Sequence, residues 1–185
     1  MHHAVAIALA AVLAVAVVSD LRSRRIPSSL TLPACLGFLL LRLFLSGLHG
    51  EDGLLSGLAG LGLGLGLMLP AYGLGVMGGG DVKLMAAVGA ALGPAGVLWS
   101  FLFTSVFGGV YALAVLLLRP EGRAALYRTF VGVVGGYLAL RGGPAPGFVV
   151  PAPAPALPRL CYGLAIAAGT CLYVYLSQAR VWVFA

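Results

Sequence analysis

Long apolar stretches, each about as long as a membrane-spanning helix, alternate in this 185-residue chain with short segments that carry most of its charges. A helix that crosses a bilayer needs about 20 apolar residues. Hydrophobic residues make up 61% of the chain and charged residues only 9%, against roughly 25% charged residues in soluble proteins. So few charges cannot cover the surface of a soluble fold. The pattern therefore predicts an all-α, polytopic membrane protein.

About six transmembrane helices are expected, within a single membrane-embedded domain that covers residues 1–185. Their approximate ranges are Ala4–Ser19, Ser28–Ser46, Leu54–Gly73, 81–92, 95–118 and 160–178. The first is expected to stop at Asp20, and the fourth to end at Gly93-Pro94. Gly73–Gly80 is too rich in glycine for a firm helix. Residues of about 119–158 are interpreted as a cytoplasmic loop or an interfacial segment.

The third span contains glycines at positions 57, 60, 62, 64 and 66. The pairs Gly60/Gly64 and Gly62/Gly66 have the four-residue spacing that lets a neighbouring helix approach closely. This spacing predicts a tightly packed helix face.

Basic residues are concentrated in alternate connecting segments. Segment 20–27 has three Arg, segment 78–83 has the single Lys of the chain, and segment 119–158 has four Arg. Positive residues mark cytoplasmic loops, so the N-terminus is expected outside. The net charge of +6 comes from these clusters and forms no stripe with interleaved aromatic residues, which argues against a nucleic-acid partner.

Cysteine and histidine are scattered and form no Cys-x-x-Cys pair, so neither a metal site nor a cofactor is expected. The three thiols are interpreted as buried groups. The positions are Cys35, Cys161, Cys171, His2, His3 and His49.

Two of the five acidic residues, Asp20 and Asp81, lie at the ends of apolar stretches beside helix-breaking sequence. A carboxylate at membrane depth is costly and indicates a function. Two carboxylates that share a site cannot both ionise easily, so one can take a proton from water while the other donates a proton. A single Asp at a helix end is more often a cap. The remaining acids, Glu51, Asp52 and Glu121, are interpreted as loop charges.

The residues just before Asp81 are Gly78, Gly79 and Gly80. Glycine allows positive φ and a close approach of the backbone to an extended substrate. The segment is not a phosphate-binding Walker loop, because its spacing is wrong and no Ser or Thr follows Lys83.

At these residues the chain resembles a known family. Gly78-Gly79-Gly80-Asp81 fits the Gly-x-Gly-Asp motif of intramembrane aspartyl proteases, and Val82-Lys83 follows it as in prepilin peptidases, the type IV leader peptidases. The first site is also similar, with Asp20 followed after five residues by Ile26-Pro27. Tyr162-Gly163-Leu164-Ala165 resembles the family's Pro-Tyr-Gly-x-Ala segment.

Two positions depart from the family pattern: Ser28 stands where Asn is common, and Cys161 stands before Tyr162 where Pro is common. Neither change removes a catalytic group. The chain also has no cytoplasmic insert with paired cysteines, so it resembles the short, peptidase-only form.

The resemblance implies an intramembrane aspartyl endopeptidase of the cytoplasmic (inner) membrane, with its active site facing the cytoplasm. It would cleave the short basic leader peptide from type IV pilin-like precursors, without a metal or a cofactor. Its partners would be those precursors and the lipid bilayer, with the substrate helix beside the glycine face of the third span. The implied catalytic residues are Asp20 and Asp81, and the implied supporting or substrate-binding residues are Gly78, Gly79, Gly80, Lys83, Ile26, Pro27, Tyr162 and Gly163.

Two other functions are compatible with the residues alone. The first is a small proton- or cation-coupled transporter that uses Asp20 and Asp81. Both acids are expected at one membrane face and no inverted repeat is evident, which disfavours it. The second is a non-catalytic assembly protein that packs through its glycine faces, which leaves the two Asp unexplained.

Overall fold

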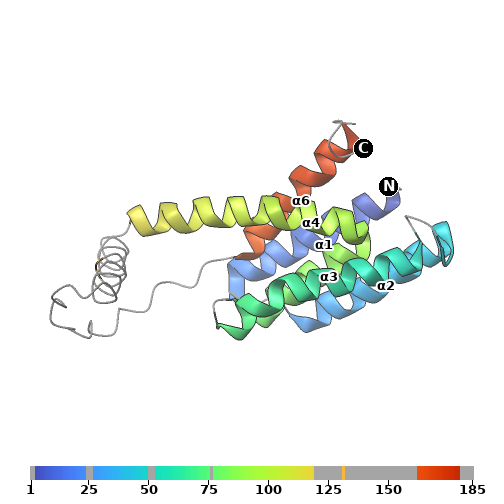
Figure 1. Ribbon diagram of the computed structural model, residues 1–185, viewed down its shortest axis with the longest axis horizontal. Helices are drawn as coiled ribbons and strands as arrows, with labels where there is room; N and C mark the ends of the chain where they lie inside the picture. Colours follow the sequence, from blue (N-terminus) through green and yellow to red (C-terminus); the bar gives the residue numbers. More distant parts are fainter. Residues whose placement is uncertain are drawn as a thin grey trace, which may run out of the picture. The chain divides into compact units, whose positions relative to one another are not determined.

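The computed structural model describes residues 3–23, 27–49, 53–75, 77–118, 131 and 162–179. All regular secondary structure in these ranges is α-helical, as the sequence predicts (Figure 1). The helices are α1 (His3–Ser23), α2 (Ser28–Ser46), α3 (Leu54–Gly73), α4 (Gly79–Leu118) and α6 (Tyr162–Gln178).

Four of these helices, α1 to α4, are long and apolar enough to cross a membrane. With 20 residues, α3 is about 30 Å long, which matches the hydrocarbon thickness of a bilayer. With 40 residues, α4 is about twice as long as one crossing requires. The described structure is therefore a polytopic helical protein with four candidate spans. The count of six crossings and the orientation of the N-terminus stay predictions.

The chain divides into two compact units, one of residues 1–108 and 161–185 and the other of residues 109–160. The described part of the second unit is the end of α4 and Val131. The predicted loop or interfacial segment at about 119–158 lies outside the described residues, apart from Val131. The single domain over the whole chain also stays a prediction. All contacts described below belong to the first unit.

Helices α2 and α3 begin and end at the predicted residues. The predicted end of α1 is wrong, because the helix continues past Asp20 to Ser23. The hydroxyl of Ser23 donates to a backbone carbonyl one turn earlier at 2.8 Å. An Asp does not by itself interrupt a helix, whereas the residue before a proline is disfavoured in the helical region. The next helix starts directly after Pro27.

The connection between α3 and α4 is shorter than the predicted glycine-rich break at 73–80. Helix α3 includes Gly73, and α4 begins at Gly79. Of the glycines in this connection, Gly75 has a positive φ, of 71°. The described residues of the connection, 74, 75, 77 and 78, are therefore non-helical, and Gly79 and Gly80 belong to the first turn of α4.

Helix α4 is broken at Gly93, which has φ 77° and ψ −177°. This conformation is essentially restricted to glycine, and Pro94 next to it has no N–H to donate. The predicted boundary at Gly93-Pro94 is confirmed. We refer below to residues 79–92 as the first half of α4 and to residues 94–118 as its second half.

The first half of α4 packs against α3 backbone to backbone. A Cβ atom at Gly60 would overlap the carbonyl oxygen of Gly89, and one at Gly64 would lie 2.6 Å from the carbonyl oxygen of Met85. Residue numbers rise along α3 as they fall along α4, so the two segments are antiparallel.

The other predicted glycine face of α3 is open toward the described part of the chain, where no atom lies within 4 Å of a Cβ at Gly62 or Gly66. Close packing through glycine is thus confirmed for the Gly60/Gly64 face alone. Since α4 occupies that face, it is not available to a substrate helix.

The second half of α4 packs antiparallel to α6. A Cβ at Gly169 would lie 2.5 Å from the backbone nitrogen of Thr104, and one at Gly108 would lie 2.8 Å from Cε2 of Tyr162. Three hydroxyl groups in these two helices, those of Ser100, Thr104 and Thr170, are fully buried and have no hydrogen-bond partner among the described residues.

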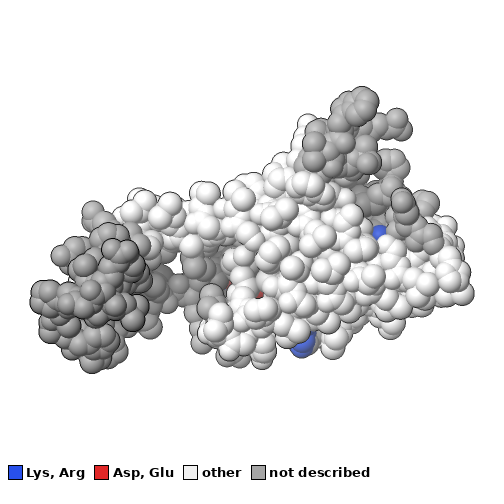
Figure 2. Space-filling view, viewed as in Figure 1, with Lys and Arg blue, Asp and Glu red and all other residues white. Residues whose placement is uncertain are grey.

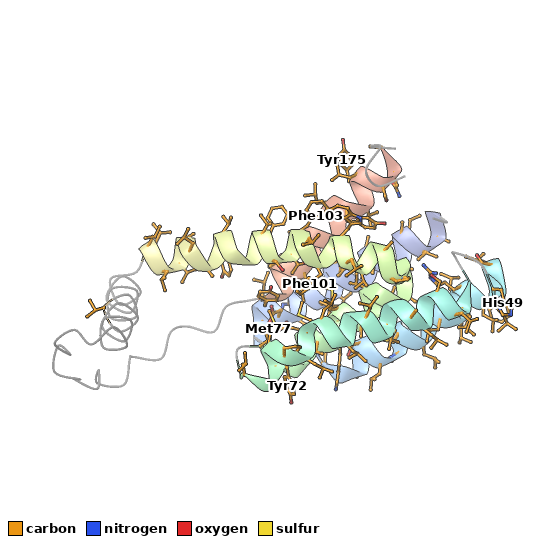
Figure 3. All side chains as sticks on the ribbon, in the orientation of Figure 1. His49, Tyr72, Met77, Phe101, Phe103 and Tyr175 are labelled. Carbon is orange, nitrogen blue, oxygen red and sulfur yellow. The ribbon has the colours of Figure 1, made fainter. Side chains whose placement is uncertain are left out.

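These contacts give the first unit two distinct ends. The C-terminal part of α1 meets the start of α6 at one end, and the C-terminal part of α2 meets the break in α4 at the other. Figure 3 shows His49 at one end of the α2–α3 pair and Tyr72 and Met77 at the opposite end.

The surface of the described residues is mostly apolar, and Figure 2 shows one face with almost no charged atoms. Large hydrophobic side chains such as Ile7 and Phe44 are exposed, as expected for helices that face lipid. Cys35 is half-buried and Cys171 is exposed, so the predicted burial of Cys171 is wrong. Cys161 lies outside the described residues.

Candidate functional site

Asp20 lies in the last turn and a half of α1 and is 6% exposed. Its Oδ2 accepts a hydrogen bond from the backbone N–H of Gly163 at 3.1 Å. The first N–H groups of a helix have no partner within the helix, so the start of α6 supplies a donor for this buried carboxylate. A residue near the end of α1 is thereby joined to a helix that follows much later in the chain.

Asp81 lies in the first turn of α4 and is partly buried. The N–H of Gly78 donates to Asp81 Oδ2 at 3.3 Å, and the N–H of Asp81 donates to the carbonyl of Gly78 at 3.1 Å. These reciprocal bonds satisfy backbone groups at the helix start. They explain why the helix begins earlier than the glycine content predicts.

The two carboxylates lie close enough for the charge of Asp20 to act on Asp81. They come from α1 and α4, so the fold brings together two residues that are distant in the sequence. Both are also partly or fully removed from solvent, where the interaction between charges is stronger than in water. The structure thus places the two predicted acids at one end of the first unit.

Tyr162 and Gly163 form the first turn of α6 beside this acid pair. The ring of Tyr162 lies over the backbone of Gly108, and the charge of Asp81 acts on its hydroxyl. Gly163 is buried and bonds to Asp20. Both residues predicted through the family resemblance therefore lie at the site.

The remaining predicted site residues are distributed around the same end. Lys83 is half-buried in the first turns of α4. Gly79 lies beside the ring of Tyr72, and a Cβ atom at Gly79 would lie 3.5 Å from Cε2 of Tyr72. Pro27 is exposed and forms the N-cap of α2, and its carbonyl accepts the N–H of Leu30 at 3.0 Å. Ile26 lies outside the described residues.

Sequence reasoning overlooked Arg42, a buried cation within α2 that is 3% exposed. Its Nε and Nη2 donate to the carbonyl of Ala91 at 3.2 and 3.0 Å, and its Nη1 donates to the carbonyl of Gly53 at 3.4 Å. The break at Gly93 and Pro94 leaves carbonyls near the end of the first half of α4 without helical N–H partners. Arg42 supplies donors there.

An arginine inside a predicted span is the sequence signal for this contact, because an intramembrane charge needs a partner. Ala91 is ten residues beyond Asp81, or about 15 Å along the helix. Arg42 is therefore a structural residue at the end of the unit that lies away from the acid pair.

Within the described ranges, no group of three or more His, Cys, Asp or Glu side chains could hold a metal ion. What the site offers is a pair of carboxylates, backbone N–H donors and one phenol. Such a set can move a proton between two carboxylates and a bound water.

Comparison with known proteins identifies the family of the chain. No curated protein and no solved structure gave a significant match to the chain. Residues 7–113, which include both Asp20 and Asp81, match the model of the type IV leader peptidase family. Because this match covers more than half of the chain, the protein belongs to the type IV leader peptidase family.

Proposed function

We propose that this peptidase is an intramembrane aspartyl endopeptidase that removes the short basic leader from type IV pilin-like precursors. The observation that carries the proposal is the pairing of Asp20 and Asp81, two scarce acids that α1 and α4 bring within electrostatic range. Family membership supplies the reaction class and the general class of substrate.

The chemistry follows from two carboxyl groups that share one proton. The ionised carboxylate takes a proton from a water molecule, whose oxygen attacks the scissile carbonyl carbon while the protonated carboxyl donates to the carbonyl oxygen. Collapse of the tetrahedral intermediate breaks the C–N bond. The leaving nitrogen takes the proton that the pair accepted from water, and the hydroxyl formed from the carbonyl oxygen returns its proton to the pair. The pair titrates as a unit, so we assign the roles of acid and base to the pair.

We place the site at the cytoplasmic face of the inner membrane. Arg22 follows Asp20 in the same helix, and Lys83 follows Asp81 in the same helix, which agrees with the preference of basic residues for the cytoplasmic side. The antiparallel path through α3, the two halves of α4 and α6 supports six crossings, with the two halves of α4 counted separately.

The segments around the acids are proposed to receive the precursor. Gly78 is exposed next to Asp81, and among the described residues only the Asp81 carboxylate lies near its Cβ position, at 3.4 Å. An extended peptide can approach a backbone that has no side chain. Gly79, Gly80, Lys83, Ile26 and Pro27 are proposed to contribute to the same substrate-binding region.

The test is cleavage of a purified precursor with a short basic leader by the full-length protein in detergent. Mass spectrometry of the product reports the new N-terminus. Asp20→Asn and Asp81→Asn should each reduce cleavage to background, because an amide can neither accept the proton of water nor share one with its partner.

Asp52→Asn is the matched control, since it makes the same chemical change in the segment between α2 and α3. This variant should cleave the precursor as fast as the wild type does. Full activity in either variant of the dyad would contradict the proposed mechanism. An inactive wild type that nevertheless dissipates a proton gradient in proteoliposomes would favour the transporter instead.

A further inference from the structure

The first turn of α6 interacts with both acids through two adjacent residues, Gly163 with Asp20 and Tyr162 with Asp81. Gly163 donates its backbone N–H to Asp20 Oδ2 at 3.1 Å in a buried position. Hydrogen bonds to an ionised acceptor are roughly twice as strong as neutral ones, and the start of a helix favours a negative charge. This contact therefore restrains the Asp20 carboxylate through the backbone of another helix.

Tyr162 fixes the position of the same turn against α4. A Cβ at Gly108 would lie 2.8 Å from Cε2, 3.2 Å from Cζ and 3.2 Å from the hydroxyl oxygen of Tyr162. The ring thus lies directly on the glycine backbone, where any larger residue would displace it. The hydroxyl also lies within the electrostatic range of Asp81.

We propose that Tyr162 and Gly163 form a positioning element that sets the Asp20 carboxylate relative to Asp81. Gly163 holds Asp20 through its backbone N–H, and Tyr162 holds the turn at the correct place by packing on Gly108. This inference rests on the proposed function, because its consequence is the geometry in which both carboxyl groups reach one water. A misplacement of about 1 Å in such a geometry can cost about 100-fold in rate.

The experiment compares Gly163→Pro with Gly163→Ala in the full-length protein, by measuring kcat and KM for leader cleavage. Proline removes the N–H and is tolerated in the first turn of a helix, whereas alanine retains the N–H. The proline variant should lose about 10- to 100-fold in kcat relative to the alanine variant, with little change in KM. Equal kcat values for the two variants, whether high or low, would overturn the role of the N–H.

Gly108→Ala and Gly109→Ala provide a second comparison that does not alter α6. Alanine at position 108 meets the Tyr162 ring, whereas no atom of the described residues lies within 4 Å of a Cβ at Gly109. Gly108→Ala should lower kcat, because the added methyl group displaces the Tyr162 ring, and Gly109→Ala should not. Equal activity of the two alanine variants would overturn the role of Tyr162.

The two proposals fail in different ways. A wild type that does not cleave the precursor overturns the proposed function and this inference together. A wild type that depends on Asp20 and Asp81, combined with equal kcat values for Gly163→Pro and Gly163→Ala, overturns the positioning role alone.

Discussion

Gly60 of α3 and Gly89 of α4 meet backbone to backbone, so that a Cβ atom on either residue would overlap the carbonyl oxygen of the other. Neither neighbour is a flexible side chain that could move aside. We expect Gly60→Ala and Gly89→Ala each to destabilise the fold by about 1–3 kcal/mol, the usual cost of overpacking. The midpoint of unfolding in a detergent titration measures this loss.

Gly62→Ala is the control for this prediction, because it makes the same change in the same helix at a position with open space. It should leave stability unchanged or raise it by up to about 1 kcal/mol, since alanine is the better helix former. A Gly62→Ala variant as unstable as Gly60→Ala would show that the α3–α4 contact is not the cause.

Arg42 caps the interrupted end of the first half of α4 through the carbonyl of Ala91. Arg42→Met retains an apolar stem of similar length but removes all its donors, which leaves buried acceptors without this partner. We expect a loss of about 1–3 kcal/mol in unfolding free energy. Phe44→Ala, at a side chain of the same helix that is 83% exposed, should unfold like the wild type in the same detergent. Equal losses in both variants would contradict a capping role.

Helix boundaries could largely be predicted from the sequence, because local chemistry determines them. The limits of α2 and α3 coincide with Pro27, Gly47 and Gly53, which punctuate the apolar stretches. The break at Gly93 follows from a glycine beside a proline. Helix α4 begins two residues before the predicted start at Asp81. The reciprocal bonds between Gly78 and Asp81 stabilise a helix start in a segment where glycine alone disfavours a helix.

The meeting of Asp20 and Asp81 at one end could also be anticipated, because the basic residues that follow each acid indicate the same membrane side. The partner of Asp20 could not be anticipated from the residues alone. Gly163 acts through its backbone N–H, a group that every residue except proline has, so only the family resemblance pointed to this position. The partners of Arg42 could not be predicted either, because they are backbone carbonyls, which every residue has.

Gly93 has a conformation that is costly for any residue with a Cβ, and its Cβ position would also lie 2.8 Å from Ser56 Oγ. Gly93→Ala should therefore lower the unfolding midpoint, by an amount that corresponds to about 1–3 kcal/mol. Gly75→Ala is the comparison, because Gly75 also has a positive φ, of 71°, but no atom of a described residue lies within 4 Å of its Cβ position. The loss at Gly93 should exceed that at Gly75, and the reverse order would contradict the importance of the break.

Thr170 of α6 has a fully buried hydroxyl that has no hydrogen-bond partner among the described residues. Replacing an unsatisfied buried hydroxyl by an apolar group of the same shape is neutral or stabilising. Thr170→Val should therefore retain or raise the unfolding temperature in detergent. Ser105→Ala is the contrasting variant, because the Ser105 hydroxyl donates to the carbonyl of Phe101 at 2.8 Å, and it should not be stabilising. A marked destabilisation by Thr170→Val would show that this hydroxyl has a partner in the membrane, such as an ordered water.

The orientation of the acid pair can be tested independently of catalysis with single cysteines in a variant that lacks Cys35, Cys161 and Cys171. Ser23→Cys lies one turn beyond Asp20, and His49→Cys lies in the connection between α2 and α3. Since a helix of about 20 residues crosses the bilayer once, positions 23 and 49, which flank α2 in the sequence, should lie on opposite sides of the membrane. In intact cells a membrane-impermeant thiol reagent should label His49→Cys and should label Ser23→Cys only after permeabilisation. The opposite pattern would place the acid pair outside, where a cytoplasmic leader could not reach it.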